Sequence, residues 1–115
     1  ELQTEGNVAF GVGQALLEEM VFDRGQLQNG NLGDYMIAST EDLPAIDVNA
    51  LEHREANEIH GIGESTLPPV VAAIGNAVAR ATGVRITDLP ITPEKLLRGL
   101  REIEAGESAQ AGHGS

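Results

Sequence analysis

Apolar residues recur at intervals of three and four positions in three separate parts of the chain, a spacing typical of amphipathic helices. The first such segment covers about residues 7–20, the second 67–82 and the third 93–103. Each helix would bury one face and leave the other to solvent. The apolar face of the first helix is formed by Val8, Val12, Leu16 and Met20.

The second and third helices have clear starts and stops. Thr66 can cap the second helix, and its first turn tolerates Pro68 and Pro69, because the N–H groups that proline lacks would be unpaired there. Gly83 is a natural stop for that helix. Thr92-Pro93-Glu94 supplies a cap, a proline at the first helical position and an acid favoured by the helix dipole, so it marks the strongest helix start in the chain.

Other patterns predict a smaller amount of strand. Residues 19–22 and 26–28 flank Asp23-Arg24-Gly25, a three-residue connection typical of a hairpin, with its glycine placed to take a left-handed conformation. Residues 46–50 alternate apolar and polar side chains like a half-buried strand, and residues 86–89 form a short extended stretch. The sequence therefore predicts an α+β fold with about three helices, a short hairpin and one or two extra strands.

Polar segments connect these elements. Residues 29–44 are dominated by glycine, asparagine and acidic residues and are expected to form an ordered loop, and residues 53–58 form a polar link. Residues 105–115 have the small, polar, glycine-rich composition of a disordered tail. We therefore expect residues 1–104 to form the folded part, as one piece of a domain.

The composition predicts a weak core. A chain of 115 residues has the length of a single domain, but two Phe, one Tyr and no Trp leave its core to Ala, Val, Leu and Ile. The 14 glycines also raise the entropy cost of ordering the chain. Such a segment completes a larger body more readily than it stands alone.

The charge and the cysteine content exclude several kinds of partner. A formal net charge of −11 repels phosphate backbones and anionic membranes, so no nucleic-acid or lipid partner is expected. No apolar run approaches the roughly 20 residues of a membrane-spanning helix, and no signal pattern is visible, which makes the cytoplasm the expected location. Without cysteine, the chain forms no disulfide and holds no iron–sulfur cluster by itself.

Gly61-Ile62-Gly63-Glu64 is the most informative motif in the chain. It places one carboxylate between two glycines and a proline-led apolar segment, residues 65–69. Because glycine has no Cβ, the backbone here can adopt conformations closed to other residues and a bulky ligand can approach the main chain. Taken alone, such a tetrapeptide is more often a glycine loop with an exposed Glu. The surrounding sequence reverses that interpretation.

Residues 61–100 resemble the C-terminal stretch of the large subunit of the molybdenum hydroxylases, the xanthine dehydrogenase and aldehyde oxidase family. Residues 3–6, a Gln-x-x-Gly element followed by GVGQALLEEMVF, resemble the preceding segment of the same subunits, so the resemblance covers nearly the whole chain except the tail. Two departures are visible. Asn7 stands where the family often has a second glycine, and His60 and Ser65 stand where it often has Lys and Pro.

The resemblance implies a catalytic role for Glu64. The family hydroxylates aldehydes or N-heterocycles using water, and it needs a base that takes the proton of the attacking hydroxyl. A carboxylate between apolar walls suits this task, and Glu64 matches its position in the motif. The resemblance also implies contacts with the molybdopterin cofactor from Gln3, Gly6, Gly61, Ile62 and Gly63.

The same resemblance implies that this chain shares the cofactor with the rest of a larger enzyme. The partners would be the remaining molybdopterin-binding region and iron–sulfur and often FAD domains or subunits, and the substrate would be a small aldehyde or heterocycle. Side chains of this chain are expected to bind no metal, since the family holds molybdenum mainly through the pterin dithiolene. His53, His60 and His113 do not form a metal-ligand spacing with neighbouring acids.

Other functions stay open at this point. One alternative is a non-catalytic piece of the same family that serves as a docking or structural subunit. Another is an acidic binding domain unrelated to molybdenum chemistry, which requires the resemblance to be accidental. A dinucleotide site at Gly11-Val12-Gly13 is disfavoured, because Leu16 stands in place of the third glycine and no strand precedes the motif.

Overall fold

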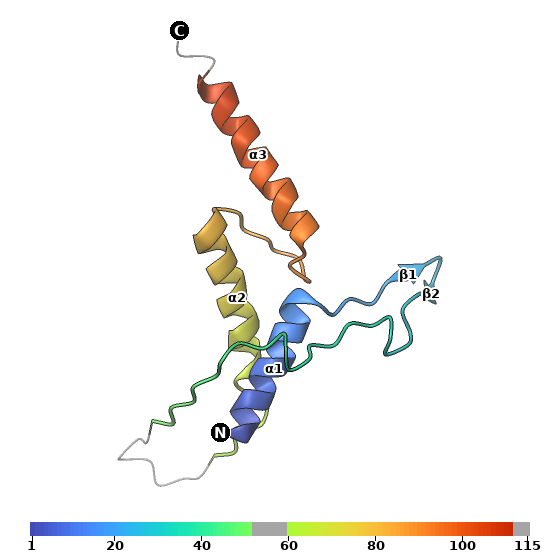
Figure 1. Ribbon diagram of the computed structural model, residues 1–115, viewed down its shortest axis with the longest axis vertical. Helices are drawn as coiled ribbons and strands as arrows, with labels where there is room; N and C mark the ends of the chain where they lie inside the picture. The colour runs from blue at the N-terminus through green and yellow to red at the C-terminus, as the bar shows by residue number, and fades with distance from the viewer. Residues whose placement is uncertain (52–59, 112–115) are drawn as a thin grey trace.

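The computed structural model describes residues 1–51 and 60–111, which form three helices and one small hairpin (Figure 1). The helices are α1 (Leu2–Leu16), α2 (Leu67–Thr82) and α3 (Pro93–Ala111). The strands β1 (Phe22–Asp23) and β2 (Gln26–Leu27) lie between α1 and α2 in the sequence. The predicted combination of three helices and a hairpin is confirmed.

Helices α1 and α2 pack against each other through one face of α1. Asn7, Gly11 and Ala15, which are spaced four residues apart and so share a face, are all buried. A Cβ on Gly11 would lie 2.7 Å from the Cβ of Val70, in the first turn of α2. Glycine at position 11 therefore permits a close approach of the two helices, which offsets its low helix propensity.

Helix α1 begins and ends earlier than residues 7–20, the range that the apolar pattern predicts. The regular hydrogen bonds of the helix end where the N–H groups of Leu17 and Glu18 both donate to the Gly13 carbonyl, at 2.9 Å each. The carbonyl of Ala15 accepts instead from the N–H of Ile91, at 2.7 Å. Because α1 begins at Leu2, the Gln-x-x-Gly element at residues 3–6 is part of the helix and does not precede it.

Helix α2 spans the predicted range. Its first turn contains Pro68 and Pro69, and Gly83 ends it in a left-handed conformation (φ 76°), with its N–H donating to the Ala79 carbonyl at 2.9 Å. One expectation is wrong. Thr66 occupies the capping position, but its side chain makes no capping hydrogen bond.

Helix α3 starts where predicted and runs further. The hydroxyl oxygen of Thr92 accepts from the backbone N–H of Lys95 at 3.3 Å, as a helix cap should. The prediction ended this helix at 103 and expected a disordered tail from 105, whereas α3 continues to Ala111. Alanine, glutamate and glutamine, all good helix formers, outnumber the single Gly106 in that stretch. The domain boundary at 104 stays a prediction, and residues 112–115 lie outside the described part.

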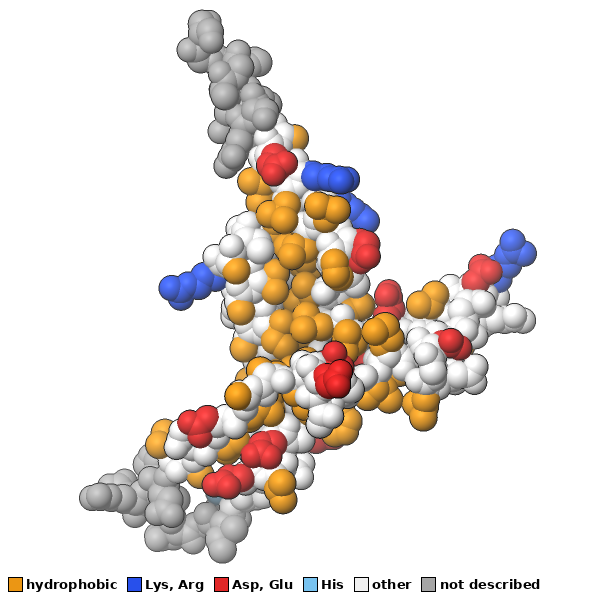
Figure 2. All heavy atoms as spheres, in the orientation of Figure 1, with side chains coloured by type: hydrophobic (Ala, Val, Ile, Leu, Met, Phe, Trp, Pro, Cys, Tyr) orange, Lys and Arg blue, Asp and Glu red, His pale blue; other side chains and the backbone are white. Residues whose placement is uncertain are grey.

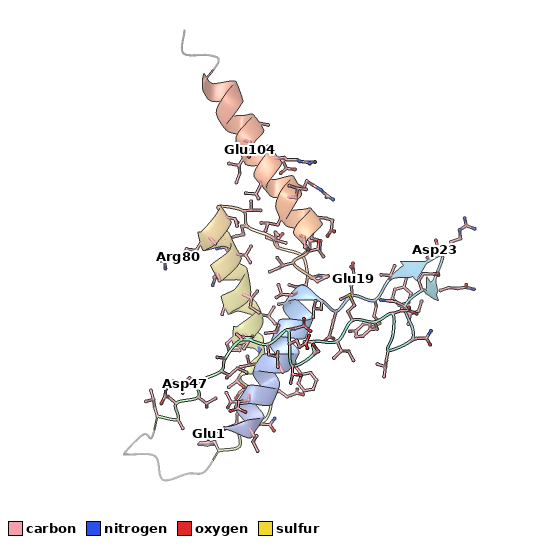
Figure 3. The ribbon with its side chains drawn as sticks, in the orientation of Figure 1. Glu1, Glu19, Asp23, Asp47, Arg80 and Glu104 are labelled. Atoms are coloured by element: carbon pink, nitrogen blue, oxygen red, sulfur yellow. The ribbon has the colours of Figure 1, made fainter. Side chains whose placement is uncertain are left out.

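The hairpin turn is tighter than predicted. Asp23 belongs to β1 and pairs with Gln26, so the connection has two residues, Arg24 and Gly25, rather than three. Both have positive φ, 47° and 80°, as two-residue turns that match the twist of a hairpin require. The hairpin projects away from the helices, with Asp23 near its tip (Figure 3).

The extra strands expected from the period-two pattern at residues 46–50 and from the extended stretch at 86–89 do not form. Ile46 and Val48 are half-buried while their neighbours are exposed, so the pattern does report one-sided burial. In residues 1–51 and 60–111, however, the only sheet is the β1–β2 pair, so residues 46–50 have no strand partner there. Residues 86–89 likewise join no sheet. The predicted link at 53–58 lies outside the described residues.

The chain is open and exposes much apolar surface. Its radius of gyration is 19.3 Å, whereas a compact domain of this length would have about 13 Å. Its accessible surface of 9377 Å² compares with about 6,000 Å² for a compact monomer of this mass. Apolar side chains gather over the middle of the molecule, where α1, α2 and the start of α3 meet (Figure 2). Within the described residues, none of the helices combines the length and the apolar character that crossing a membrane requires.

Lys95 ties the loop between α2 and α3 to the first turn of α3. Its Nζ donates to the carbonyls of Asp88 and Pro90, at 3.1 and 2.9 Å, and pairs with the Asp88 carboxylate at 2.7 Å. The hydrogen bond from Lys95, followed by its charge, lowers the pKa of Asp88 below its ordinary value. This contribution to stability is therefore present above the pKa of unfolded Asp, and it is lost as the pH falls through the lower folded value.

We expect Lys95→Met to destabilise this loop by about 1–2 kcal/mol, since charge-assisted bonds to two carbonyls are lost while an apolar stem remains. The pair with Asp88 adds little to that figure because the carboxylate is exposed. Hydrogen exchange of the amides in residues 84–92, measured on the assembled protein, should become faster. Arg101→Met, an exposed position on the same helix, is the control. Equal changes in both variants would contradict the assignment.

Candidate active site

The predicted site residues meet where the first half of α1 crosses the loop that precedes α2. The side chain of Gln3 donates from Nε2 to the carbonyl of Gly63 at 2.9 Å, although the two residues are 60 positions apart. The side chain of Asn7 donates from Nδ2 to the same carbonyl, also at 2.9 Å. Two elements that the sequence singled out separately are therefore in direct contact.

The Gly-x-Gly-Glu motif forms a tight turn into α2. The N–H of Ser65 donates to the Ile62 carbonyl and the N–H of Leu67 to the Glu64 carbonyl, both at 3.1 Å. Gly63 has a φ of 52°, a left-handed conformation that favours glycine. Gly61 has no positive φ, so only the second glycine of the motif is required by the backbone conformation.

Glu64 lines a cavity of about 660 Å³ between α1, the start of α2 and the loop before α3. Its walls include the apolar side chains of Phe10, Met20, Leu67 and Pro90. Glu64 itself is exposed in the described structure, so the cavity is open on the side of the carboxylate. The segment that follows α1 contributes two more acids to the lining, Glu18 and Glu19. Glu19 lies just beyond the end of α1 (Figure 3).

Tyr35 and Glu18 form a polar pair on the wall of this cavity that the sequence did not predict. The Tyr35 hydroxyl donates to Oε2 of Glu18 at 2.8 Å. This hydrogen bond, together with desolvation and the charge of Glu18, raises the pKa of Tyr35, which therefore stays a neutral donor. The only available signal was the apolar island Tyr35-Met36-Ile37 in a loop rich in glycine, asparagine and acidic residues, and it gives no indication of a partner for Tyr35.

The remaining predicted cofactor contacts have open space beside them. A Cβ on Gly6 or Gly61 would meet no atom within 4 Å, and the side chain of Ile62 is 47% exposed. The bond from Gln3 uses one N–H of its amide, which leaves the second N–H and the amide oxygen to bind a ligand. Open space beside an amide with donors and an acceptor fits a ligand rich in polar edges, such as the molybdopterin that the resemblance implies.

Metal binding by side chains has no candidate in the described part of the chain. There, no group of three or more His, Cys, Asp or Glu side chains is arranged to hold a metal ion. His60 is an exposed residue next to Gly61, whereas His53 and His113 fall outside the described residues.

Comparison with known proteins identifies relatives of this chain. Residues 1–44 match the family of the molybdopterin cofactor-binding domain. The chain is 43% identical over 101 residues, or 84% of its length, to the putative xanthine dehydrogenase molybdenum-binding subunit XdhA of Escherichia coli strain K12. It is 36% identical over 107 residues, or 88% of its length, to the aldehyde oxidoreductase molybdenum-binding subunit PaoC of the same strain.

A solved structure shows the same arrangement. The crystal structure of quinoline 2-oxidoreductase from Pseudomonas putida 86 superimposes on 87% of this chain with a TM-score of 0.77 and 38% sequence identity. The chain spans only a small part of these proteins: 13% of XdhA, 15% of PaoC and 14% of the quinoline 2-oxidoreductase chain.

Proposed function

We propose, from the premise that this chain belongs to the xanthine dehydrogenase and aldehyde oxidase family of molybdenum hydroxylases, that it supplies the catalytic base of a molybdopterin-dependent oxidoreductase. The reaction is the hydroxylation of an aldehyde or an N-heterocycle with oxygen from water, and Glu64 is the base. The observation that carries the proposal is the pair of hydrogen bonds from Gln3 and Asn7 to the Gly63 carbonyl. They hold the backbone directly before Glu64, which a merely solvated acid would not need.

In this proposal Glu64 transfers the proton, and other residues of the chain bind the cofactor and the substrate. A carboxylate oxygen of Glu64 takes the proton from the hydroxyl that attacks the substrate carbon and later releases it to solvent. Bound molybdopterin supplies the molybdenum that accepts the electrons of the reaction. The free polar edge of Gln3 and the side-chain-free surface at Gly6, Gly61 and Gly63, together with Ile62, hold the cofactor. Phe10 and Leu67 offer apolar walls to a planar substrate.

The exposed apolar surface indicates what completes this site. Phe10, Met20 and Leu32 are 63, 62 and 81% exposed, which is far more than apolar residues in a finished core. We propose that the remaining molybdopterin-binding region of the enzyme covers them and closes the cavity over Glu64. Iron–sulfur and often flavin components then carry the electrons onward.

The test uses this chain within the whole enzyme, made with its partner subunits in a host that synthesises molybdopterin. Molybdenum content per subunit and hydroxylation of a panel of aldehydes and N-heterocycles are measured in ¹⁸O-labelled water. We expect one molybdenum per subunit and ¹⁸O in the product. Protein that lacks molybdenum, or product that carries no label, would overturn the proposal.

The chain by itself is expected to bind no molybdopterin and to show no hydroxylase activity. A cofactor enclosed by several distant segments has little affinity for a partial, open site, and this chain offers one wall of it. Metal analysis and mass spectrometry of the chain, produced alone in a molybdopterin-competent host, check this expectation. A stoichiometric molybdenum content would contradict it.

A further inference from the structure

We propose that Asn7 is a positioning residue for Glu64, which acts by holding the backbone on both sides of the carboxylate. This inference rests on the proposed function and deepens it. Asn7 is buried, with 3% of its surface exposed, and it lies on the face of α1 that packs against α2. A buried amide is costly unless it is hydrogen-bonded, so its bonds indicate what its presence achieves.

The two bonds of Asn7 bracket Glu64 in the sequence. Nδ2 donates to the carbonyl of Gly63, the residue before Glu64, at 2.9 Å, and to Oγ1 of Thr66, two residues after it, at 2.7 Å. A carbonyl oxygen can only accept, so the nitrogen of the amide must face Gly63. One side chain thus fixes both ends of the short turn that carries the carboxylate.

The role of Thr66 supports this interpretation. Thr66 stands at the N-cap of α2, where threonine normally bonds a backbone N–H of the first turn, yet it makes no such bond. Its hydroxyl oxygen accepts from Asn7 instead. The Thr66 hydroxyl therefore connects the start of α2 to Asn7 on α1. The same Asn7 amide also holds the turn that carries Glu64.

The face of α1 that carries Asn7 is packed closely against α2. Asn7 lies one turn before Gly11, where the close approach to Val70 sets the spacing between α1 and α2. The second donor to the Gly63 carbonyl, Gln3, is exposed and is the residue that we assign to the cofactor. Asn7 is consequently the buried member of the pair, and it connects the helix packing to the position of Glu64.

The test compares variants in the assembled enzyme by the rate of reduction by substrate, expressed per bound molybdenum. Asn7→Ala removes both donors and should lower this rate about 10–100-fold, because a misplacement of the base by about 1 Å costs on that order. The KM for substrate should change little. Asn7→Asp keeps the shape but presents an acceptor to the Gly63 carbonyl, so it should lose at least as much.

Thr66 supplies the conservative comparison. Thr66→Ser keeps the hydroxyl that accepts from Asn7 and should retain the wild-type rate within a few-fold, whereas Thr66→Val removes it and should lower the rate about 10-fold. Asn76→Ala, an exposed asparagine on α2, is the control for loss of an amide and should leave the rate unchanged.

Normalisation to molybdenum separates a positioning role from a structural one. If Asn7→Ala lowers cofactor content while the rate per molybdenum stays normal, Asn7 only supports folding and the inference is wrong. If Asn7 acts through Glu64, Asn7→Ala should cause no further loss in a Glu64→Gln background, because residues that act as a unit are not additive. If the losses of rate from Asn7→Ala and Glu64→Gln are fully additive in the double variant, the inference is also wrong. A Glu64→Gln variant that reacts normally instead refutes the proposed base, whatever Asn7 does.

Discussion

Replacing Glu64 with glutamine in the assembled enzyme is expected to lower the rate of reduction by substrate by at least about 10²–10⁴-fold, the range of general-base catalysis. Glutamine keeps the size and shape of the side chain, but it has an NH2 donor in place of one carboxylate oxygen and cannot take up the proton. The loss should be larger still where the base also generates the nucleophile. Stopped-flow measurement of the reductive half-reaction gives the rate directly, without contributions from later electron transfer.

Cofactor content should stay near normal in the same variant. The carboxylate of Glu64 lines the cavity, whereas the proposed contacts with molybdopterin come from Gln3 and the main chain of the glycine motif. Molybdenum occupancy measured on the same preparation therefore decides the interpretation. Full occupancy with a rate within a few-fold of wild type means that Glu64 is no catalytic base, and loss of occupancy together with rate means that it is structural.

Elements with local signals could be predicted from the sequence. Helix α2 has the predicted range because its prolines and Gly83 act within one turn of its ends. The start of α3 follows from the cap at Thr92 in the same way. The C-terminal end of α1 could not be predicted, since its last turn depends on the bond from Ile91 to Ala15, made by a loop far along the chain.

The site was predictable in part and for a similar reason. The sequence singled out Gln3, Gly63 and Glu64 through the family resemblance, and the structure places Gln3 against Gly63. It did not predict the bonds of Asn7, because nothing local shows that a residue inside a helix faces a turn 56 positions later. The Tyr35–Glu18 pair was missed likewise. Side chains brought together by packing leave no periodic pattern to read.

The close contact between α1 and α2 gives the second large expected effect. A Cβ on Gly11 would lie 2.7 Å from both Cβ and Cγ1 of Val70, and neither atom is the far end of a flexible side chain. Gly11→Ala must therefore push the helices apart, and overpacking of this kind costs about 1–3 kcal/mol. Hydrogen exchange of the α1 and α2 amides in the assembled subunit, which reports local opening, should become faster.

Gly75→Ala is the matched control for this substitution. Gly75 also lies inside a helix of the same pair, so both variants gain the same helix propensity of about 1 kcal/mol. A Cβ on Gly75 would meet only Cδ1 of Ile91, at an ordinary 3.9 Å, so this variant should exchange more slowly than wild type. The two alanines should thus shift exchange in opposite directions. Equal protection in both variants would mean that the helices are not held at this distance in the assembled subunit, and that the spacing beneath Asn7 and Glu64 is set elsewhere.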